Sequence, residues 1–461
     1  MFFKIIVHLL FCGSIFAVSD FLQIIESNLG DINEVCDNIN IFPNDSVLEA
    51  VQKFYKEEIE NLNIPEIFDL KKTDEPFLIY LQNKNWTEDI DQIADDYNKL
   101  CETDSESIHD FLRKIELPFF KLNYNNLKLD KNCTRASENL KSQYQIYFVH
   151  PNIRKMFAYK FDNLAIHLEN IRAYYWLKEN EEVLKKVTDL FNSFVEDVSK
   201  IIESTRWLKN TQSVISFKEV LRQIRLKNMT EMAYGSLKEI KEILKQFKNC
   251  TEYSVKLVCL AKITVSPAVN LNNAKSYNIN PWILIHNTLL YSISNNTRPG
   301  AIYGTIGVAL ARELGHTVIK SSHDPVFLPY FSENVKNCVQ KQINSSCSIF
   351  GQNLRMANDE AFENNSAEIF AVNFAFKQFK NAYEKEIHTP INESTNNLTN
   401  SQLFYLSYLS MSTDKSEIGK SAAIVQSSDF GNSFKCAANT RMMMSKTDQC
   451  YMFGCKAPLL R

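Results

Sequence analysis

Glycine and proline, the residues that most often interrupt regular structure, are scarce in this chain. Only 11 glycines and 12 prolines occur in 461 residues, roughly a third and a half of their usual shares. A sandwich or propeller of short strands needs frequent turns, and therefore more of both residues. Hydrophobic residues make up 45% and charged residues 23%, which is typical of a globular chain. The sequence therefore predicts a mainly α (α+β) protein with long helices.

Two segments carry the periodicity of amphipathic helices. Apolar residues recur at i, i+3 and i+4 spacing across residues 181–203, and a similar stripe runs through residues 237–247. Such stripes are typical of core-facing helix surfaces and not of ligand surfaces. Short β-prone runs replace this pattern near residues 256–275, which predicts a small β-ribbon there and a domain change near residue 265.

The first nineteen residues have the pattern of a secretory signal. Residues 1–4 give a positively charged start, residues 5–17 form an apolar run, and small residues follow at Ala17 and Ser19. The run is shorter than the roughly 20 apolar residues that a membrane-spanning helix needs. We predict a signal peptide at residues 1–19 and a secreted, extracellular protein. The alternative is an uncleaved signal anchor that holds the protein on the membrane.

Export changes how the cysteines are interpreted. The chain has 11 cysteines, and removal of Cys12 with the signal leaves an even number, which predicts up to five disulfides. No paired C-x-x-C spacing indicates a zinc ribbon. Ten N-x-S/T sequons support the same compartment and predict a glycoprotein. Two of them, at Asn392 and Asn397, lie in a polar segment at residues 389–401 that we expect to be an exposed loop.

The charge balance argues against one large class of partners. Lys and Arg number 51 and Asp and Glu number 54, so the formal net charge is −3. Nucleic-acid-binding proteins usually carry a basic excess or a basic stripe. We therefore expect no nucleic-acid partner.

One short motif carries candidate chemistry. Residues 312–316 read Arg-Glu-Leu-Gly-His, one substitution away from the zinc-binding pattern H-E-x-x-H. Residues at i and i+4 lie above one another on a helix face, so that two imidazoles there can share one zinc ion. The glutamate between them deprotonates the metal-bound water.

The surroundings of this motif resemble the neprilysin-like family of zinc metallopeptidases, which includes neprilysin and endothelin-converting enzyme. Tyr303-Gly304-x-Ile306-Gly307 precedes the motif as in the family helix Y-G-x-I-G-x-x-x-x-H-E-x-x-H, and residues 364–368 match the family's E-N-x-A-D in part. Looser matches lie at residues 402–406 (family Q-L-F-F-L), along residues 434–450, at the half-cystine Cys338, at Asn273 and Ala274 of the family's substrate strand, and at Trp207 and Leu208.

The resemblance implies a two-domain architecture and an ancestral activity. We expect a helical N-terminal lid domain at residues 20–265 and a thermolysin-like (gluzincin) peptidase domain at residues 266–461. In the family, this architecture performs zinc-dependent cleavage of short extracellular peptides.

The departures from the family pattern fall on the zinc ligands. The resemblance places Arg312, His316 and Asn364 where the family has two histidines and a glutamate, so only His316 is a conventional ligand. A catalytic zinc needs three protein ligands and a water, whereas arginine is always protonated. A guanidinium about 4 Å from a dication costs on the order of 8 kcal/mol at an effective dielectric of about 20. We therefore expect His316 to be vestigial, and no zinc or other cofactor to be bound.

The neighbouring acids keep their positions without their ancestral partners. Glu313 lies at the general-base position with no metal-bound water to act on, and Glu368 replaces the acid that orients the first zinc histidine in the family. We predict that Arg312 pairs with Glu368 or Glu313 and fills the position of the metal.

Other residues do not restore the missing ligands. His323 follows an expected helix end, and Glu360 or Glu363 could supply a carboxylate in a shifted register but not the first histidine. Residues 413–420 also lack the His and the Arg with which the family binds substrate and stabilises the oxyanion.

The sequence therefore predicts a secreted pseudopeptidase, and three hypotheses for its role stay open. It is a binding module that captures extracellular peptides or a protein partner, or a structural protein that works through its outer surface. The third hypothesis is a residual zinc metalloendopeptidase that uses other ligands. Metal analysis separates the third from the others, and peptide binding without turnover separates the first from the second.

Overall fold

The computed structural model describes most of the chain. The described residues are 21–42, 46–60, 86–102, 105–115, 132–149, 151–205, 211–227, 229–250, 262–268, 276–279, 282–294, 298–321, 333–351, 359–411 and 417–450. They are mainly helical, so the predicted fold class is confirmed. None of the helices within these ranges combines the length and the apolar character that a membrane crossing needs.

The chain divides into two compact units. The first contains the described residues of Met1–Ile59, Leu177–Met229 and Asn272–Arg461, and the second contains those of Glu60–Trp176 and Thr230–Leu271. Residues 177–229 thus belong with the C-terminal part of the chain as a compact unit. The expected family domains, at residues 20–265 and 266–461, stay a prediction.

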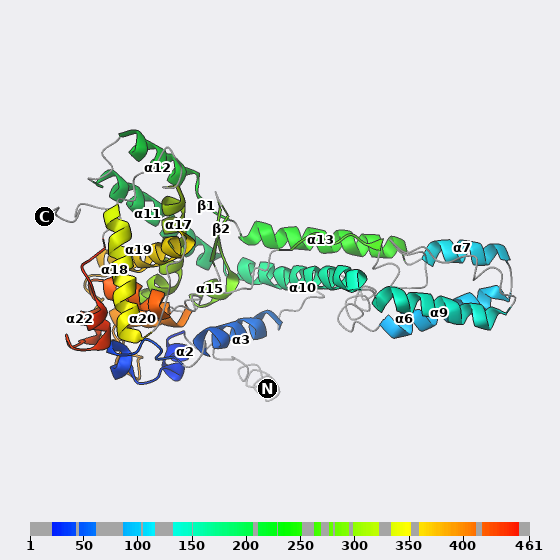
Figure 1. Ribbon diagram of the computed structural model, residues 1–461, viewed down its shortest axis with the longest axis horizontal. Coiled ribbons are helices and arrows are strands. Elements are labelled where there is room, and N and C mark those ends of the chain that lie inside the picture. The colour runs from blue at the N-terminus through cyan, green and yellow to red at the C-terminus, as the bar shows by residue number, and fades with distance from the viewer. Residues whose placement is uncertain are drawn as a thin grey trace, which may run out of the picture. The chain divides into compact units, whose positions relative to one another are not determined.

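The first unit is built around three helices, α17 (Val308–Ser321), α19 (Asp359–Ala382) and α20 (Asn400–Met411) (Figure 1). Helix α19 packs along α17 and α21, and α20 packs on α16 and η2. The other elements of this unit are α2 (Phe21–Asn28), η1 (Ile32–Cys36), α3 (Ser46–Glu60), α11 (Glu181–Glu203), α12 (Thr211–Gln223), α15 (Asn287–Tyr291), α16 (Pro299–Ile302), η2 (Tyr303–Gly307), α18 (Glu333–Phe350), α21 (Glu417–Gln426), α22 (Phe430–Phe434) and α23 (Arg441–Ser445).

Helix α20 is buried on nearly its whole circumference, because every residue except Gln402 is shielded from solvent. A helix that is apolar all round must lie inside a core. Aromatic rings of α19 and α20 interlock there, with Phe376 stacked on Tyr405 at 5.1 Å between ring centroids and edge-on to Phe404 at the same separation. The Tyr405 hydroxyl is satisfied by Ser427 Oγ at 2.7 Å.

The stripe predicted at residues 181–203 is confirmed. Helix α11 covers this range, and its buried residues are Val183, Val187, Phe191, Phe194, Val198 and Ile202. Phe194 packs edge-on against Phe374 of α19, 5.0 Å between centroids, so the stripe faces the core of the first unit.

A small sheet of three strands lies beside α17. Strand β3 (Trp282–Ile285) is central, with β2 (Ser276–Ile279) antiparallel on one side and β1 (Arg225–Leu226) parallel on the other. Of the ribbon predicted at residues 256–275, only residues 262–268 lie within the described part, and they form no strand but bond to helices. Residues 256–261 and 269–275 lie outside the described part, so the rest of that prediction stays a prediction.

Gly304 lets the polypeptide backbones of η2 and α20 approach closely. A Cβ atom added at Gly304 would overlap the carbonyl oxygen of Phe404 and lie 3.0 Å from the carbonyl carbon. A Cβ added at Gly307, one turn further on, meets nothing closer than Tyr303 at 3.4 Å, an ordinary van der Waals contact. The two glycines of the Y-G-x-I-G segment therefore differ in what they permit, and of these two only Gly304 is needed for a close approach of backbones.

We predict that Gly304→Ala lowers the free energy of unfolding by about 1–3 kcal/mol, because the extra methyl group forces the helices apart. Gly307→Ala is the matched control and is expected to change it by less than about 1 kcal/mol, since alanine gains helix propensity there. Chemical denaturation of both variants measures the difference. Equal losses in the two variants would contradict the close approach at Gly304.

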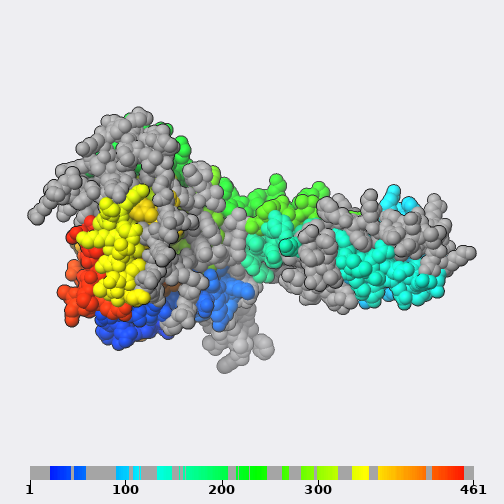
Figure 2. Space-filling model, viewed as in Figure 1, coloured from blue at the N-terminus to red at the C-terminus, as the bar shows by residue number. Residues whose placement is uncertain are grey.

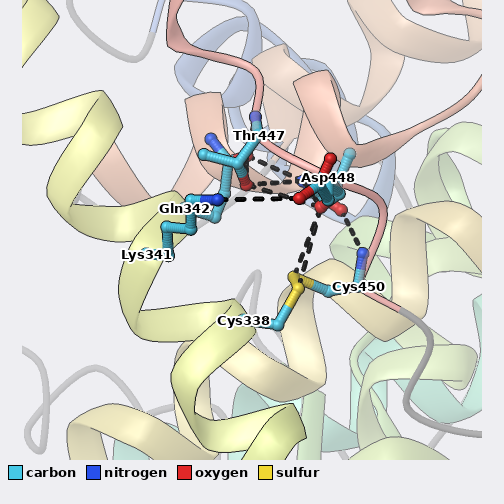
Figure 3. A network of polar contacts seen from close by, with 7 residues as sticks. Cys338, Lys341, Gln342, Thr447, Asp448 and Cys450 are labelled. Atoms are coloured by element: carbon cyan, nitrogen blue, oxygen red, sulfur yellow. Dashed lines mark hydrogen bonds and ion pairs between the residues drawn. A yellow bond between two sulfur atoms is a disulfide. The ribbon is translucent and has the colours of Figure 1, made fainter. Parts of the chain in front are cut away.

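Two buried glutamines hold residues 445–450 against the helices α18 and α21 (Figure 3). Gln342 of α18 and Gln426 of α21 are both fully buried. Gln342 Oε1 accepts hydrogen bonds from Gln426 Nε2 at 2.7 Å and from the Thr447 backbone at 2.9 Å, and Gln426 Oε1 accepts from the Cys450 backbone at 2.7 Å. The disulfide Cys338–Cys450 joins the same segment to α18. Residues 445–450 are thus held by side-chain amides as well as by a covalent bond.

The N-terminal elements lie on the same face as the C-terminal ones (Figure 2). A disulfide joins Cys36 at the end of η1 to Cys436 beyond α22, and a third disulfide, Cys101–Cys133, lies in the second unit. Three of the predicted disulfides are therefore present in the described part. Cys259 and Cys455 lie outside it.

Glu26 of α2 is hydrogen-bonded to the loop at residues 391–399. Its carboxylate accepts hydrogen bonds from Ser394 Oγ at 2.6 Å, from the Thr395 hydroxyl at 3.0 Å, and from the backbone N–H groups of Thr395 and Asn396 at 3.2 Å each. Burial alone raises the pKa of Glu26, but these hydrogen bonds outweigh it and hold the pKa below the ordinary value of 4.5. The loop exposes Asn392 and Asn397 as predicted, while its base is tied to α2.

We predict that Glu26→Gln costs about 1 kcal/mol of stability near neutral pH, allowing for the partial solvent exposure of the carboxylate. Because the pKa is lower in the folded chain, the contribution of Glu26 is complete above the unfolded value and is lost as pH falls through the folded value. The variant and the wild type should therefore converge in stability at acid pH. Denaturant midpoints measured on both sides of the ordinary pKa test this, with exposed Glu34→Gln as the control. A difference in stability between the variant and the wild type that persists unchanged in acid would contradict a role for the charged carboxylate in these hydrogen bonds.

The second unit consists of helices and of the segment at residues 262–268. Its helices are α6 (Trp86–Cys101), α7 (Ser105–Ile115), α9 (Cys133–Val149), α10 (Pro151–Glu179) and α13 (Met229–Cys250), the last two of which cross the boundary at one end. Helix α6 packs against α9 and α7, and the Tyr144 hydroxyl donates to the Ile115 carbonyl at 2.5 Å. Hydrogen bonds between side chains join α10 to α13.

Candidate functional site

The candidate site lies where α17 packs on α19, inside the first unit. Arg312, Glu313 and His316 are on α17, and Asn364 and Glu368 are on α19. Arg312 and His316 are one turn apart on α17, as Asn364 and Glu368 are on α19, so each pair shares a helix face. The structure thus brings the two motifs predicted from the sequence onto neighbouring helices.

Arg312 is the cation of this site. Its Nε lies 2.7 Å from Glu368 Oε2, and its Nη1 donates a hydrogen bond to Glu313 Oε1 at 3.3 Å. The contact with Glu368 is a close ion pair whose angles are outside those of a hydrogen bond. The predicted pairing of Arg312 is confirmed, and both acids take part rather than one.

The two acids that Arg312 pairs with are buried, so the pairing matters for stability. The side chains of Glu313 and Glu368 are each only 3% exposed, while that of Arg312 is 28% exposed. A carboxylate removed from water without a cation or hydrogen-bond donors costs several kcal/mol. The guanidinium therefore offsets the burial of two acids while one side of it still reaches solvent.

Tyr408 is a member of the site that the sequence analysis missed. It lies on α20, and its hydroxyl donates to Glu368 Oε1 at 2.7 Å. Glu368 is therefore held from two directions, by Arg312 at one oxygen and by Tyr408 at the other. The only sequence signal is the tyrosine itself, because a buried tyrosine hydroxyl usually needs a partner.

Gly315 allows the two helices to come close enough for the ion pair. A Cβ atom added there would lie 2.9 Å from Phe370 Cδ1 and 3.6 Å from the Ala367 backbone. Small residues thus face each other across the α17–α19 contact, next to Arg312 and Glu368. His316 is also buried, 7% exposed, so Glu313 and His316 face the interior while Arg312 stays partly exposed.

These residues do not fit a catalytic zinc ion. Asn364 supplies a neutral amide, and Glu368 already holds the guanidinium of Arg312 at 2.7 Å. Within the described ranges, no group of three or more His, Cys, Asp or Glu side chains is arranged to hold a metal. A tetrahedral site with three protein ligands and a water needs such a group, so no step of a reaction is routed through zinc here.

Some sequence predictions fall outside this geometry. Asn273 and Ala274 of the expected substrate strand, His323, and the pair Trp207 and Leu208 lie outside the described residues, and so do residues 413–416 of the segment 413–420. Glu363 is half-buried on α19. The roles predicted for Glu313, Glu368, His316 and Asn364 rest on the resemblance and stay predictions.

Comparisons with known proteins show no family for this chain. No family model matches it. A CRISPR-associated protein of Methanocaldococcus jannaschii is 28% identical over 152 residues, which are 32% of this chain and 23% of that protein's length. This match spans too little of either protein to show a family.

A solved structure has a weak likeness to the chain. It is a zinc metalloprotease of Mycobacterium tuberculosis in complex with an inhibitor, with a TM-score of 0.37 and 9% identity, covering 67% of this chain and 50% of that one. A likeness at this level carries no argument about fold or activity.

We predict that Arg312→Gln lowers the free energy of unfolding by about 3 kcal/mol, because it leaves two buried carboxylates without their cation. Lys341→Gln is the control in the same unit. Its partner is Asp448 at 3.6 Å, both side chains are more than half exposed, and its loss should cost less than about 0.5 kcal/mol.

A double-mutant cycle isolates the ion pair. Glu368→Gln keeps an acceptor for Tyr408, and the Arg312→Gln/Glu368→Gln variant should be more stable than the sum of the single losses predicts, by about 1–3 kcal/mol. Additive losses would contradict a direct interaction between the two side chains.

Proposed function

We propose that this protein is a catalytically inactive homologue of the neprilysin-like zinc metallopeptidases, secreted from the cell, that binds extracellular peptides or a protein partner without cleaving them. The single observation that supports this most is the ion pair of Arg312 with Glu368 and Glu313. In the family pattern these positions carry the first zinc histidine, the acid that orients it, and the general base.

A fixed cation in this position replaces the structural role of a metal but not its chemistry. The guanidinium neutralises the acids as a zinc ion would. However, it has no open coordination position, so it cannot bind a water or lower the pKa of that water. Glu313 can then act as an ion-pair partner of Arg312 but has no activated water to deprotonate. This arrangement excludes hydrolysis by an activated water. Of the roles that need no catalysis, we propose the binding of peptides or a protein partner.

Restoring the family ligands is the test of this proposal. We predict that the wild-type protein purifies without one equivalent of zinc and does not hydrolyse short peptides. Arg312→His combined with Asn364→Glu supplies the two missing ligands beside His316, and this variant should bind zinc tightly and cleave peptides in a chelator-sensitive way.

Two controls sharpen this test. In the restored background, Glu313→Gln should keep the zinc and lose the hydrolysis, because it removes only the general base. Arg312→His alone should bind zinc more weakly, since two ligands rarely hold a catalytic zinc. Zinc bound by the wild-type protein, or a correctly folded restored variant that binds none, would contradict the proposed descent of the site.

A further inference from the structure

Residues 262–268, called the strap here, lie across two helices of the second unit, and residues 264–268 belong to neither a helix nor a strand. Their exposure alternates, with Ile263 and Val265 buried (2% and 7% exposed) and Thr264 and Ser266 exposed. Alternation of this kind is the pattern of a strand that faces a core on one side. The strap thus has the form of an extended peptide held by two aliphatic anchors.

Helix α13 accepts hydrogen bonds from the strap's backbone. The N–H of Thr264 donates to Gln246 Oε1 at 3.3 Å, and the N–H of Ser266 donates to Glu239 Oε1 at 2.9 Å. Gln246 and Glu239 are seven residues apart, two turns along one face of α13. The strap therefore runs antiparallel to α13 with every second N–H group bound.

Helix α10 completes these contacts from the other side. The N–H of Ala268 donates to Asn163 Oδ1 at 2.7 Å, Lys160 Nζ donates to the Ile263 carbonyl at 2.8 Å, and His167 Nε2 bonds to the Ser266 carbonyl at 3.0 Å. These three side chains lie at i, i+3 and i+7 on one helix face. Together with Glu239 and Gln246 they form what we call the backbone seat.

Two members of the backbone seat are also held by the helices α10 and α13. His167 Nε2 must carry a hydrogen because a carbonyl oxygen can only accept, and Nδ1 lies 3.0 Å from Ser236 Oγ, which in turn accepts from Asn170 Nδ2 at 3.2 Å. His167, Ser236 and Asn170 are all buried. Asn163 Nδ2 donates to the Tyr159 carbonyl at 2.7 Å. The helices themselves therefore help to orient His167 and Asn163 toward the strap.

The five hydrogen bonds described between the seat and the strap all go to the main chain of the strap. The bound N–H groups belong to Thr264, Ser266 and Ala268, and Pro267, which has no N–H, falls between two of them. Recognition of this kind takes affinity from main-chain hydrogen bonds and specificity from pockets for alternate side chains. A foreign peptide with the same features would meet the same donors and acceptors.

We propose that the backbone seat is a receptor site for extended peptides with aliphatic residues at two alternate positions, which the protein's own strap occupies in the absence of such a ligand. This site is separate from the one under the proposed function, because none of its residues contacts Arg312 or its acids in the described hydrogen bonds. A tethered strap acts at a high effective concentration, so a free peptide competes well only when the strap is weakened.

Peptide binding by the full-length protein with a weakened strap tests the site. Ile263→Ser combined with Val265→Ser removes both anchors and leaves the seat intact. The probe is the fluorescently labelled heptapeptide Lys-Ile-Thr-Val-Ser-Pro-Ala, the sequence of residues 262–268. Fluorescence polarisation should show that the weakened variant binds this peptide at least about tenfold more tightly than the wild type does. A peptide with serine in place of both aliphatic residues should not bind.

Seat variants made in the weakened background separate recognition from nonspecific adhesion. Glu239→Leu removes an acceptor and should weaken peptide binding about tenfold, whereas Glu239→Gln keeps an acceptor and should preserve it. Arg312→Gln should leave peptide binding unchanged, which keeps this test distinct from that of the proposed function.

Three outcomes would overturn the proposal. One is a folded, weakened variant that does not distinguish the two peptides. Another is a weakened variant that fails to fold, as judged by circular dichroism, since the strap would then be an inseparable part of the core. The third is a dimer that exchanges straps between copies and binds no added peptide.

Discussion

The arrangement of the first unit depends on one buried ion pair, that of Arg312 with Glu368 and Glu313. Two carboxylates lie between packed helices, and each would destabilise the fold if it had no cation or donor nearby. Arg312 and Tyr408 meet this requirement from different helices. The contact between α17 and α19 therefore needs charge compensation as much as it needs apolar packing.

The rest of the first unit keeps these helices in place. Small residues, Gly315 against Ala367 and Gly304 against the Phe404 backbone, set the spacing of α17, α19 and α20. The buried amides of Gln342 and Gln426 and the disulfide Cys338–Cys450 hold the C-terminal segment against α18 and α21. A metal ion at this site would have to displace the guanidinium of Arg312 from both acids.

Features that arise from local sequence pattern could be predicted. The scarcity of glycine and proline and the stripe at residues 181–203 indicated long helices, and α11 buries the residues of that stripe. The pairing of Arg312 with Glu368 or Glu313 followed from the resemblance, which places both acids beside residue 312, and from the permanent charge of arginine. The helix predictions succeeded because they depend on residues that are close in sequence, and the pairing succeeded because a buried charge must be compensated.

Features that arise from tertiary contacts could not be predicted in the same way. Tyr408 lies 40 residues from Glu368, and nothing in either neighbourhood specifies their meeting. The β-prone pattern of Ile263 and Val265 correctly indicates that these side chains are buried and that Thr264 and Ser266 are exposed. Hydrophobic alternation cannot tell whether the partners of such a backbone are strands or helix side chains, so the strand predicted there was wrong at residues 262–268. Disulfide pairing, such as Cys36 with Cys436, likewise depends on the final fold.

Anomalous diffraction at the zinc absorption edge, from crystals of the wild-type protein soaked in a zinc salt, shows whether the site beside His316 takes up the metal. We predict no anomalous peak beside His316, with the Arg312 guanidinium still in contact with Glu368. A strong peak coordinated by His316, with Arg312 turned away from Glu368, would contradict it.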